Sequence, residues 1–219
     1  MALCMLAFAA PACAQVSGSL GVVSDYRYRG YSLSNDEPAL QGDIEWAATD
    51  GFYAGLFVST VRDPHGANGA LWIPYAGFAR RDSRGHSWDV GVRWSHFDAA
   101  SGYDYPEVHV GVAFRRVTLR AHYAHDYFGG APGVYVEVDG GIPFADRWQV
   151  LLHAGAAHDV ENGGAGTRYD VRAGFSLATR VCDVSLSWQG TRGETGYPYD
   201  PPWDPYDRGG WVLGCVHHW

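Results

Sequence analysis

Charged and polar side chains recur at every second position near the N-terminus, a pattern that gathers them on one face of a β-strand. Two such runs would share one face of the first predicted hairpin: Asp25, Arg27, Arg29, Gln41, Asp43 and Glu45. Opposite charges that line an enclosed wall can select the ions that pass it. They can equally pair with one another and fill the interior, and the sequence leaves both roles open.

The same alternation continues in three later segments, whose polar positions would line the same interior: Asp89, Arg93, Glu107, His109, Arg120 and His122. A two-residue turn at Arg115-Arg116 would place His109 directly opposite His122, with Glu107 one step away. Two imidazoles and a carboxylate are ligands that transition metals accept. Two ordinary polar side chains in a lumen satisfy the pattern as well, so we predict no metal site.

Serine and histidine are sequence neighbours at two places, His86-Ser87 and Ser95-His96. Neighbouring side chains on a strand point to opposite faces, so neither pair joins a nucleophile to its general base. The sequence contains neither a Gly-x-Ser-x-Gly elbow nor a phosphate-binding loop. We therefore predict a protein that is not an enzyme and needs no cofactor, with a lipid-modifying enzyme as the least favoured alternative.

The composition favours strands over helices. The 219 residues include 29 Gly and 15% aromatic side chains, and both classes are typical of strands and turns. No apolar run approaches the ~20 residues of a membrane-spanning helix. The net charge is −8 without a basic cluster, which argues against a nucleic-acid partner because phosphates require a concentrated Lys/Arg face.

The first residues predict an export signal. Residues 2–10 are almost wholly apolar, and Ala12-Cys13-Ala14 is a small-x-small cleavage site. We therefore expect residues 1–14 to be a signal peptide and residues 15–219 to be a single domain. Acylation of Cys13, as in a lipoprotein, is the less favoured alternative.

Export delivers the chain to an oxidising compartment, where two cysteines would remain after cleavage. Cys182 would open one of the last two strands, and Cys215 would lie near the end of the other, on the same apolar face. We predict a cross-strand disulfide between them. Two separate thiols are the alternative.

Alternating apolar and polar residues predict strands along the whole chain after Gln15. Ten are expected near 16–28, 40–46, 87–94, 107–115, 116–123, 133–142, 147–158, 168–177, 181–190 and 210–219. Two more segments, 52–61 and 70–79, are apolar on both faces. Counting them predicts twelve strands, and ten is the alternative if that region is misread.

The connections between these strands alternate in length. One set is short: 49–51, 81–85, 115–116, 143–146 and 178–179. The other set is longer: 29–38, 62–69, 98–104, 126–132, 159–166 and 191–209. Short turns on one side and long loops on the other are typical of outer-membrane barrels. An even strand count returns Trp219 to the side of the short turns, where a terminal aromatic resembles an outer-membrane assembly signal.

These patterns predict an all-β fold, a single closed antiparallel transmembrane β-barrel in the bacterial outer membrane. In hydrocarbon every backbone N–H and C=O must bond internally, so the sheet has to close. Apolar side chains would then face lipid and lipopolysaccharide, and charged ones would face the lumen. The outer-membrane assembly machinery would insert such a chain. Alternation alone also fits a soluble β-sandwich, and the loop asymmetry favours the barrel.

One region resembles a known family. Ser24-Asp25-Tyr26, Arg29-Gly30-Tyr31-Ser32 and Pro38-Ala39-Leu40-Gln41-Gly42, followed by Gly51-Phe52-Tyr53-Ala54-Gly55 and Ser59, resemble the TorF-type porin family over residues 20–60. The resemblance implies an outer-membrane barrel that is called a porin by analogy, and it supplies neither a substrate nor a catalytic residue. The chain departs from the family at its end, where Trp219 replaces the expected Phe.

The expected function is passive diffusion of small polar solutes or ions through a porin-like channel. A non-conducting structural or adhesion barrel is the alternative. The strand number does not decide between them, because a barrel of ~8 strands is filled by side chains and one of ~16 holds an aqueous channel.

Overall fold

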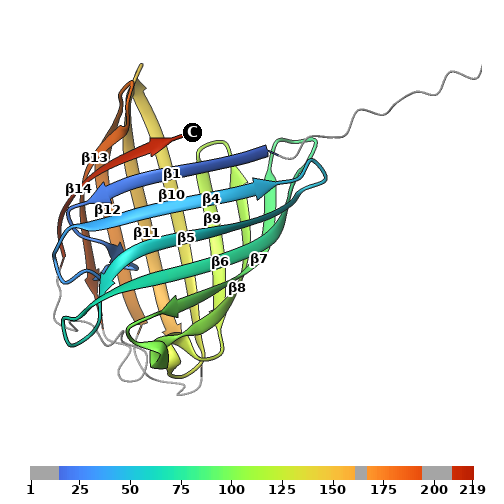
Figure 1. Cartoon of the computed structure of the whole chain (residues 1–219). Coiled ribbons are helices and arrows are strands. Elements are labelled where there is room, and N and C mark those ends of the chain that lie inside the picture. Colours follow the sequence, from blue (N-terminus) through green and yellow to red (C-terminus); the bar gives the residue numbers. More distant parts are fainter. Residues whose placement is uncertain (1–14, 161–166, 194–208) are drawn as a thin grey trace, which may run out of the picture.

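The computed structural model describes residues 15–160, 167–193 and 209–219. The predicted signal peptide lies outside the described residues, as do most of the predicted loops at 159–166 and 191–209. Twelve strands of the described part form one closed antiparallel barrel, which confirms the predicted fold class and strand number. Figure 1 shows the strands tilted around a common axis, with β1 beside β4.

The barrel strands follow one another around the wall, each paired with the next. They are β1 (Gln15–Val23), β4 (Ala39–Ala47), β5 (Phe52–Arg62), β6 (Asn68–Arg81), β7 (Ser87–Phe97), β8 (Tyr105–Phe114), β9 (Val117–Ala124), β10 (Gly133–Ala145), β11 (Trp148–Asp159), β12 (Thr167–Ala178), β13 (Asp183–Arg192) and β14 (Gly210–His218). The sheet closes where β1 pairs with both β4 and β14, at Val22 opposite Leu40 and Cys215.

Two short 3-10 helices, η1 (Ser101–Tyr103) and η2 (Tyr127–Gly129), lie in the connections after β7 and β9. Among the residues that the structure describes, no helix has the length and apolar character needed to cross a membrane.

The outer wall of the barrel is apolar. Val16, Val110 and Trp211 have 59%, 58% and 66% of their surface exposed, and their strand neighbours point inward. Such exposure of large apolar side chains is costly in water and favourable in lipid. Closure satisfies the backbone of every strand from within the sheet.

The tryptophans that the structure describes form two bands on this wall. Four lie at the strand ends that meet the short turns: Trp46, Trp88, Trp148 and Trp219. Four others lie toward the opposite ends: Trp72, Trp94, Trp188 and Trp211. Paired aromatic bands mark the two lipid–water interfaces of outer-membrane barrels. The bands therefore delimit the part of the barrel that lies in hydrocarbon.

The turns agree with the predicted asymmetry. The connection at Arg115-Arg116 has two residues, and His109 pairs directly with His122 across it, as predicted. Arg115 has a φ of 53°, in the left-handed region that two-residue hairpins require. The remaining short turns lie at the same end of the barrel.

The terminal residue closes the seam between the first and last strands. The backbone of Trp219 exchanges two hydrogen bonds with Gly18, of 3.1 and 3.2 Å. A Cβ atom on Gly18 would lie 2.5 Å from the indole ring, so only glycine leaves room for this ring against the wall.

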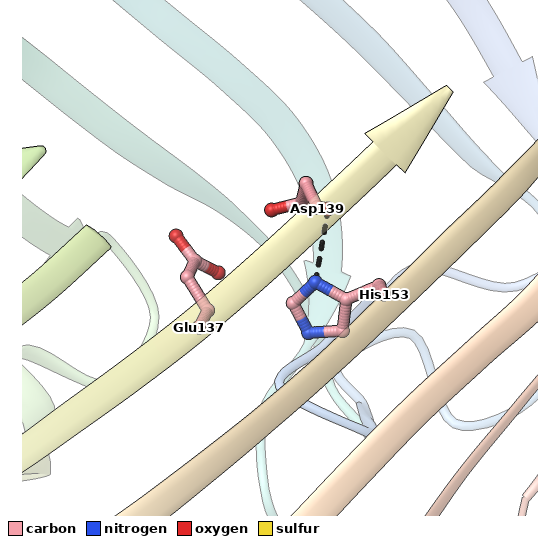
Figure 2. Close-up of side chains that lie close together, drawn as sticks. All are labelled: Glu137, Asp139 and His153. Atoms are coloured by element: carbon pink, nitrogen blue, oxygen red, sulfur yellow. Dashed lines mark hydrogen bonds and ion pairs between the residues drawn. The ribbon is translucent and has the colours of Figure 1, made fainter. Parts of the chain in front are cut away.

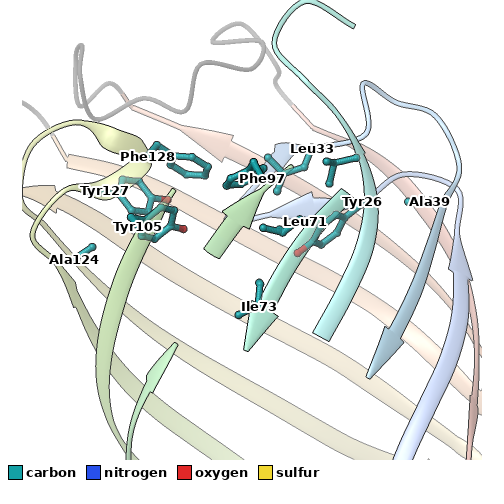
Figure 3. Close-up of a cluster of buried hydrophobic side chains, with 11 residues drawn as sticks. Tyr26, Leu33, Ala39, Leu71, Ile73, Phe97, Tyr105, Ala124, Tyr127 and Phe128 are labelled. Atoms are coloured by element: carbon teal, nitrogen blue, oxygen red, sulfur yellow. The ribbon is translucent and has the colours of Figure 1, made fainter. Parts of the chain in front are cut away.

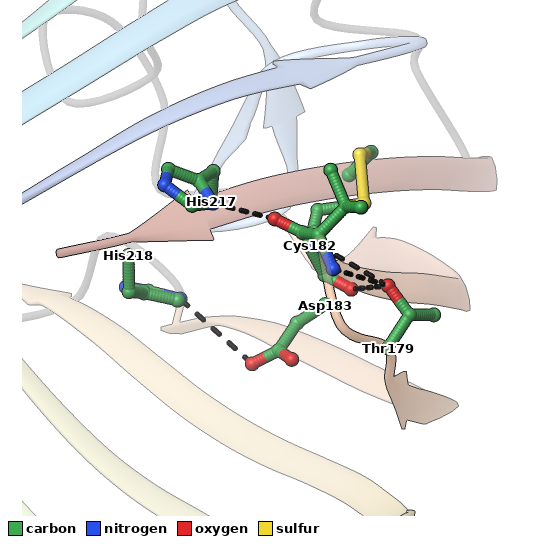
Figure 4. The surroundings of a disulfide bond; sticks show 7 residues. Thr179, Cys182, Asp183, His217 and His218 are labelled. Carbon is green, nitrogen blue, oxygen red and sulfur yellow. Dashed lines mark hydrogen bonds and ion pairs between the residues drawn. A yellow bond between two sulfur atoms is a disulfide. The ribbon is translucent and has the colours of Figure 1, made fainter.

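Near the same end, Cys182 and Cys215 are joined by a disulfide whose Cα atoms lie 5.8 Å apart (Figure 4). Cys215 pairs with Val184 in the ladder, so the bond runs diagonally from the start of β13 to β14. It links the last two strands beside the barrel seam.

The first strand is expected near residues 16–28 and is shorter in the structure. β1 ends at Val23, so the expectation that Asp25, Arg27 and Arg29 lie on it is wrong. Ser24 instead leaves the sheet after bonding to Leu213, through its backbone N–H and its Oγ.

The chain then folds into the barrel as what we call the inner segment, residues 24–38. It carries a small hairpin, β2 (Arg27–Tyr28) and β3 (Tyr31–Ser32), joined by Arg29 and Gly30. Both joining residues have positive φ, of 50° and 86°, as a type I′ turn requires.

Apolar side chains pack around the inner segment at the end of the barrel opposite the short turns. Tyr26 and Leu33 of the inner segment meet Leu71 and Phe97 of the wall (Figure 3). Phe128 of η2 packs in the same cluster, with its ring centroid 5.8 Å from that of Phe97. A packed apolar cluster thus joins the inner segment to β4–β9 at this end of the barrel.

Candidate functional site

The predicted lining residues reach the lumen from two sources. Nine of them lie on barrel strands and point inward: Gln41, Asp43, Glu45, Asp89, Arg93, Glu107, His109, Arg120 and His122. The other three reach it from the inner segment: Asp25, Arg27 and Arg29. The structure does not place all twelve in one site, because they form separate groups on different parts of the wall.

The tightest group surrounds Glu107 and consists of Arg29, Arg93, Glu107 and His122, which we call the Glu107 cluster. A guanidinium nitrogen of Arg29 donates to both Glu107 oxygens, at 2.9 and 2.7 Å. Arg93 forms an ion pair with the same carboxylate, and His122 Nδ1 lies 2.7 Å from Glu107 Oε1. The side chains of Arg29 and Glu107 are only 4% and 1% exposed. The cluster therefore ties the inner segment to β8 with a buried ion pair.

Aromatic rings surround the Arg29 guanidinium. Its Cζ lies 4.0 Å from the ring centre of Tyr135 and 4.9 Å from that of Tyr28, within the range of cation–π attraction. Burial raises the pKa of the Tyr28 hydroxyl well above its usual value, so this group stays protonated while it accepts a hydrogen bond from Arg93 at 2.5 Å.

The inner segment is also held by contacts of its own. Asp25 accepts hydrogen bonds from Ser32 and Ser34 at 2.6 and 3.1 Å and forms an ion pair with Arg27 at 2.5 Å. Further around the wall, Arg168 of β12 donates to the Tyr31 hydroxyl at 2.9 Å. Together with the bond to Glu107 of β8, these contacts hold the segment to two separate strands of the wall, so it is an ordered part of the fold.

A second group forms around Asp89, closer to the short turns. Its carboxylate receives the Tyr53 hydroxyl at 2.6 Å and lies 2.8 Å from His109 Nε2. Arg120 Nε is 3.6 Å from the same carboxylate. Although His109 and His122 face each other, with ring centres 5.7 Å apart, each binds a different carboxylate. The two imidazoles are therefore not arranged around a single ligand position.

A third group is acidic. Asp43 and Glu45 lie together on β4, and the Tyr75 hydroxyl is 3.2 Å from Asp43 and 3.3 Å from Glu45. Gln41, further along the strand, lies 3.4 Å from the Ser59 hydroxyl.

Sequence reasoning missed a fourth group, on β10 to β12. His153 lies between two carboxylates, with Nδ1 2.9 Å from Asp139 and Nε2 2.8 Å from Asp170. Arg172 donates to Asp139 at 3.1 Å, and Glu137 bonds His122 at 2.9 Å. The sequence does hold a signal for this group, because the alternation predicts strands there and places these polar positions on the inward face.

Two cavities meet at the level of the Glu107 cluster. The larger, of about 600 Å³, extends toward the short turns and is lined by Glu45, Asp89 and Arg120 among others. The smaller, of about 120 Å³, is lined by Arg27, Arg29, His153, Asp170, Arg172 and Gln189 among others. Tyr28, Arg93 and Glu137 line both cavities, so these three side chains form the partition between them.

Ser95 and His96 do not contact each other as a catalytic pair would. Ser95 is buried, at 2% exposure, and faces the lumen. His96 faces the other way, where its Nδ1 lies 2.6 Å from Asp104.

A closed barrel with an apolar outer wall, two aromatic bands and a charged lumen defines the class of bacterial outer-membrane β-barrels. Within it, residues 8–203 match a family described as "Bacterial protein of unknown function (Gcw_chp)", and the chain belongs to this family. No curated protein matches the sequence.

Solved outer-membrane barrels share the fold. One is the KdgM porin, solved in complex with disordered oligogalacturonate. It has 9% identity and a TM-score of 0.55, with 92% of this chain and 98% of that chain covered. Another is the COG4313 outer membrane channel from Pseudomonas putida F1, with 10% identity, a TM-score of 0.59 and 96% of each chain covered. At such low identity these likenesses establish the architecture alone.

Proposed function

We propose that this protein is a narrow outer-membrane channel through which small polar solutes or ions diffuse passively. The observation that carries the proposal is the pair of cavities that adjoin across Tyr28, Arg93 and Glu137, both with charged side chains in their lining. A solute that leaves bulk water needs replacement partners along its route. Charged and hydroxyl groups line both cavities and supply such partners.

The Glu107 cluster would form the narrowest point of this route. Arg29 and Arg93 reach one carboxylate from the inner segment and from β7, so both signs of charge flank the partition. Charged side chains at a constriction set the ion preference of a pore. We expect a small conductance with a preference that depends on these residues.

Two further observations support a channel. Two of the solved barrels of similar fold, named above, are a porin and a channel by name, and residues 20–60 resemble the TorF-type porins. Insertion by the outer-membrane assembly machinery, after removal of residues 1–14, belongs to the same proposal. The seam position of Trp219 suits an assembly signal.

A non-conducting structural barrel is the second candidate, and one observation favours it. The apolar cluster around Leu33, Phe97 and Phe128 packs the inner segment against β4–β9 at the end of the lumen opposite the short turns. If that packing never opens, the cavities are closed to the cell exterior.

Planar-bilayer recording separates the two candidates. We expect the purified, folded barrel to give discrete current steps, and Arg29→Met to change their size and ion preference by releasing the inner segment. Arg84→Met, in an exposed short turn, is the matched control and should leave both unchanged. Folded protein without current in all three forms would exclude the channel and support the structural barrel.

A further inference from the structure

Three metal-ligand side chains converge beside the smaller cavity, whose lining also includes Arg29. One ligand atom from each of Glu137, Asp139 and His153 lies within 4.8 Å of the others. Figure 2 shows the two carboxylates on β10 and the imidazole on β11, with Asp139 bonded to the ring. Glu137 and His153 line the cavity, so a hydrated ion in that space can reach them.

The imidazole is oriented as metal-binding histidines are. A liganding histidine almost always donates its other ring N–H to a carboxylate or carbonyl, which fixes the ring. Here His153 Nε2 is 2.8 Å from Asp170, whose carboxylate also receives the Tyr135 hydroxyl at 3.1 Å. Nδ1 is the nitrogen that faces Asp139 and thus the cluster.

In the metal-free form a proton takes the place of the ion. Carboxylates only accept hydrogen bonds, so an imidazole that bonds a carboxylate with each nitrogen carries a proton on both. A metal that enters between His153 Nδ1 and Asp139 releases the Nδ1 proton to solvent. Among the described residues, the bonds to these carboxylates engage Oδ1 of Asp139 and Oε1 of Glu137, and each carboxylate has a second oxygen to offer.

The neighbouring histidine is a poorer candidate. His122 also bridges two carboxylates, Glu107 and Glu137. Glu107, however, is already paired with two guanidinium groups, whose charges repel a divalent cation. Around His153 the carboxylates of Asp139, Asp170 and Glu137 gather. Among the described residues, Arg172 bonds this group through Asp139. Arg27, Arg29 and Arg93 line the same cavity, where they pair with Asp25 or Glu107. The local charge therefore favours a cation more than the charge around His122 does.

We propose that Glu137, Asp139 and His153 bind a divalent transition-metal ion in the barrel lumen. One nitrogen and two oxygens suit Zn²⁺ and its neighbours in the series better than Mg²⁺ or Ca²⁺, which take oxygen ligands. A water from the cavity completes the coordination. Asp170 is a positioning residue that acts through His153.

Equilibrium dialysis against Zn²⁺, with the full folded chain in detergent, tests the site without requiring any conductance. We expect the unaltered protein to bind one Zn²⁺ more per chain than His153→Gln. Asp170→Asn should retain this ion with affinity reduced about 10- to 100-fold, the usual effect of removing such a partner. His109→Gln, which alters another lumen histidine with a single carboxylate partner, should bind as the unaltered protein does.

The dialysis has a clear opposing outcome. Equal Zn²⁺ content and affinity in the unaltered protein and in His153→Gln would overturn the site, because the bound ions would then belong to exposed histidines. If His153→Gln fails to fold, Asp139→Asn removes another ligand and decides the question by the same comparison. Lower affinity at acid pH is expected, since protons compete for Nδ1.

Discussion

The ion pair between Arg29 and Glu107 should be the main tether of the inner segment. Glu107→Gln keeps the shape of the side chain and removes its charge. Both partners are almost fully buried, at 4% and 1% exposure, so Arg29 would be left without its carboxylate inside the barrel. Breaking a buried pair from one side costs about 3–5 kcal/mol. Arg93 is 21% exposed and would keep its hydrogen bond to the Tyr28 hydroxyl. Most of the lost stability should therefore come from the unpaired charge of Arg29.

The double variant makes this expectation specific. Arg29→Met in the Glu107→Gln background removes the stranded charge, so it should recover part of the loss, and the cycle should give a coupling of roughly 3 kcal/mol. Urea unfolding in phospholipid vesicles, followed by tryptophan fluorescence, measures each free energy. Glu45→Gln is the matched control, because within the described part of the chain its carboxylate bonds the Tyr75 hydroxyl alone, at 3.3 Å. It should change stability by about 1 kcal/mol or less. A coupling below about 1 kcal/mol would refute the tether.

Two further predictions concern the wall. The oxidised protein should show no reactive thiol in denaturant once residues 1–14 are removed and two after reduction, and Cys182→Ser with Cys215→Ser should lose about 2–4 kcal/mol of stability; equal thiol titres before and after reduction would contradict the disulfide. Val110→Arg should destabilise the barrel by about 2–4 kcal/mol in vesicles, because this side chain is 58% exposed on the lipid face. A loss no larger than that of Val110→Thr would mean that the face does not contact hydrocarbon.

Local sequence patterns were sufficient to predict most of the architecture. A strand places successive side chains on opposite faces, so alternation along residues 105–124 was enough to orient Val110 outward and His109 inward. The two-residue turn at Arg115-Arg116 then set the register of that hairpin, including the pairing of His109 with His122.

The prediction for the inner segment is wrong because its residues do alternate but belong to a separate two-stranded sheet inside the barrel. Residues 24–28 continue the period of two, and this led to a strand that ran past Val23. The pattern Arg29-Gly30, which suits a tight turn with positive φ, was the local sign that a separate small hairpin forms there.

The lumen groups depended on the tertiary structure. Arg29 and Glu107 are 78 residues apart in the chain, and Arg168 and Tyr31 are 137 apart. A period of two says which face a side chain occupies, because that depends only on the pleat of its own strand. Which side chains meet across the lumen depends on closure, strand stagger and the path of the inner segment, and no stretch of sequence contains those distances. The sequence by itself therefore determined the strands, the face that each side chain occupies and the location in the outer membrane. The folded barrel decided the partition between the two cavities, the ion pairs across the lumen and the cluster around His153.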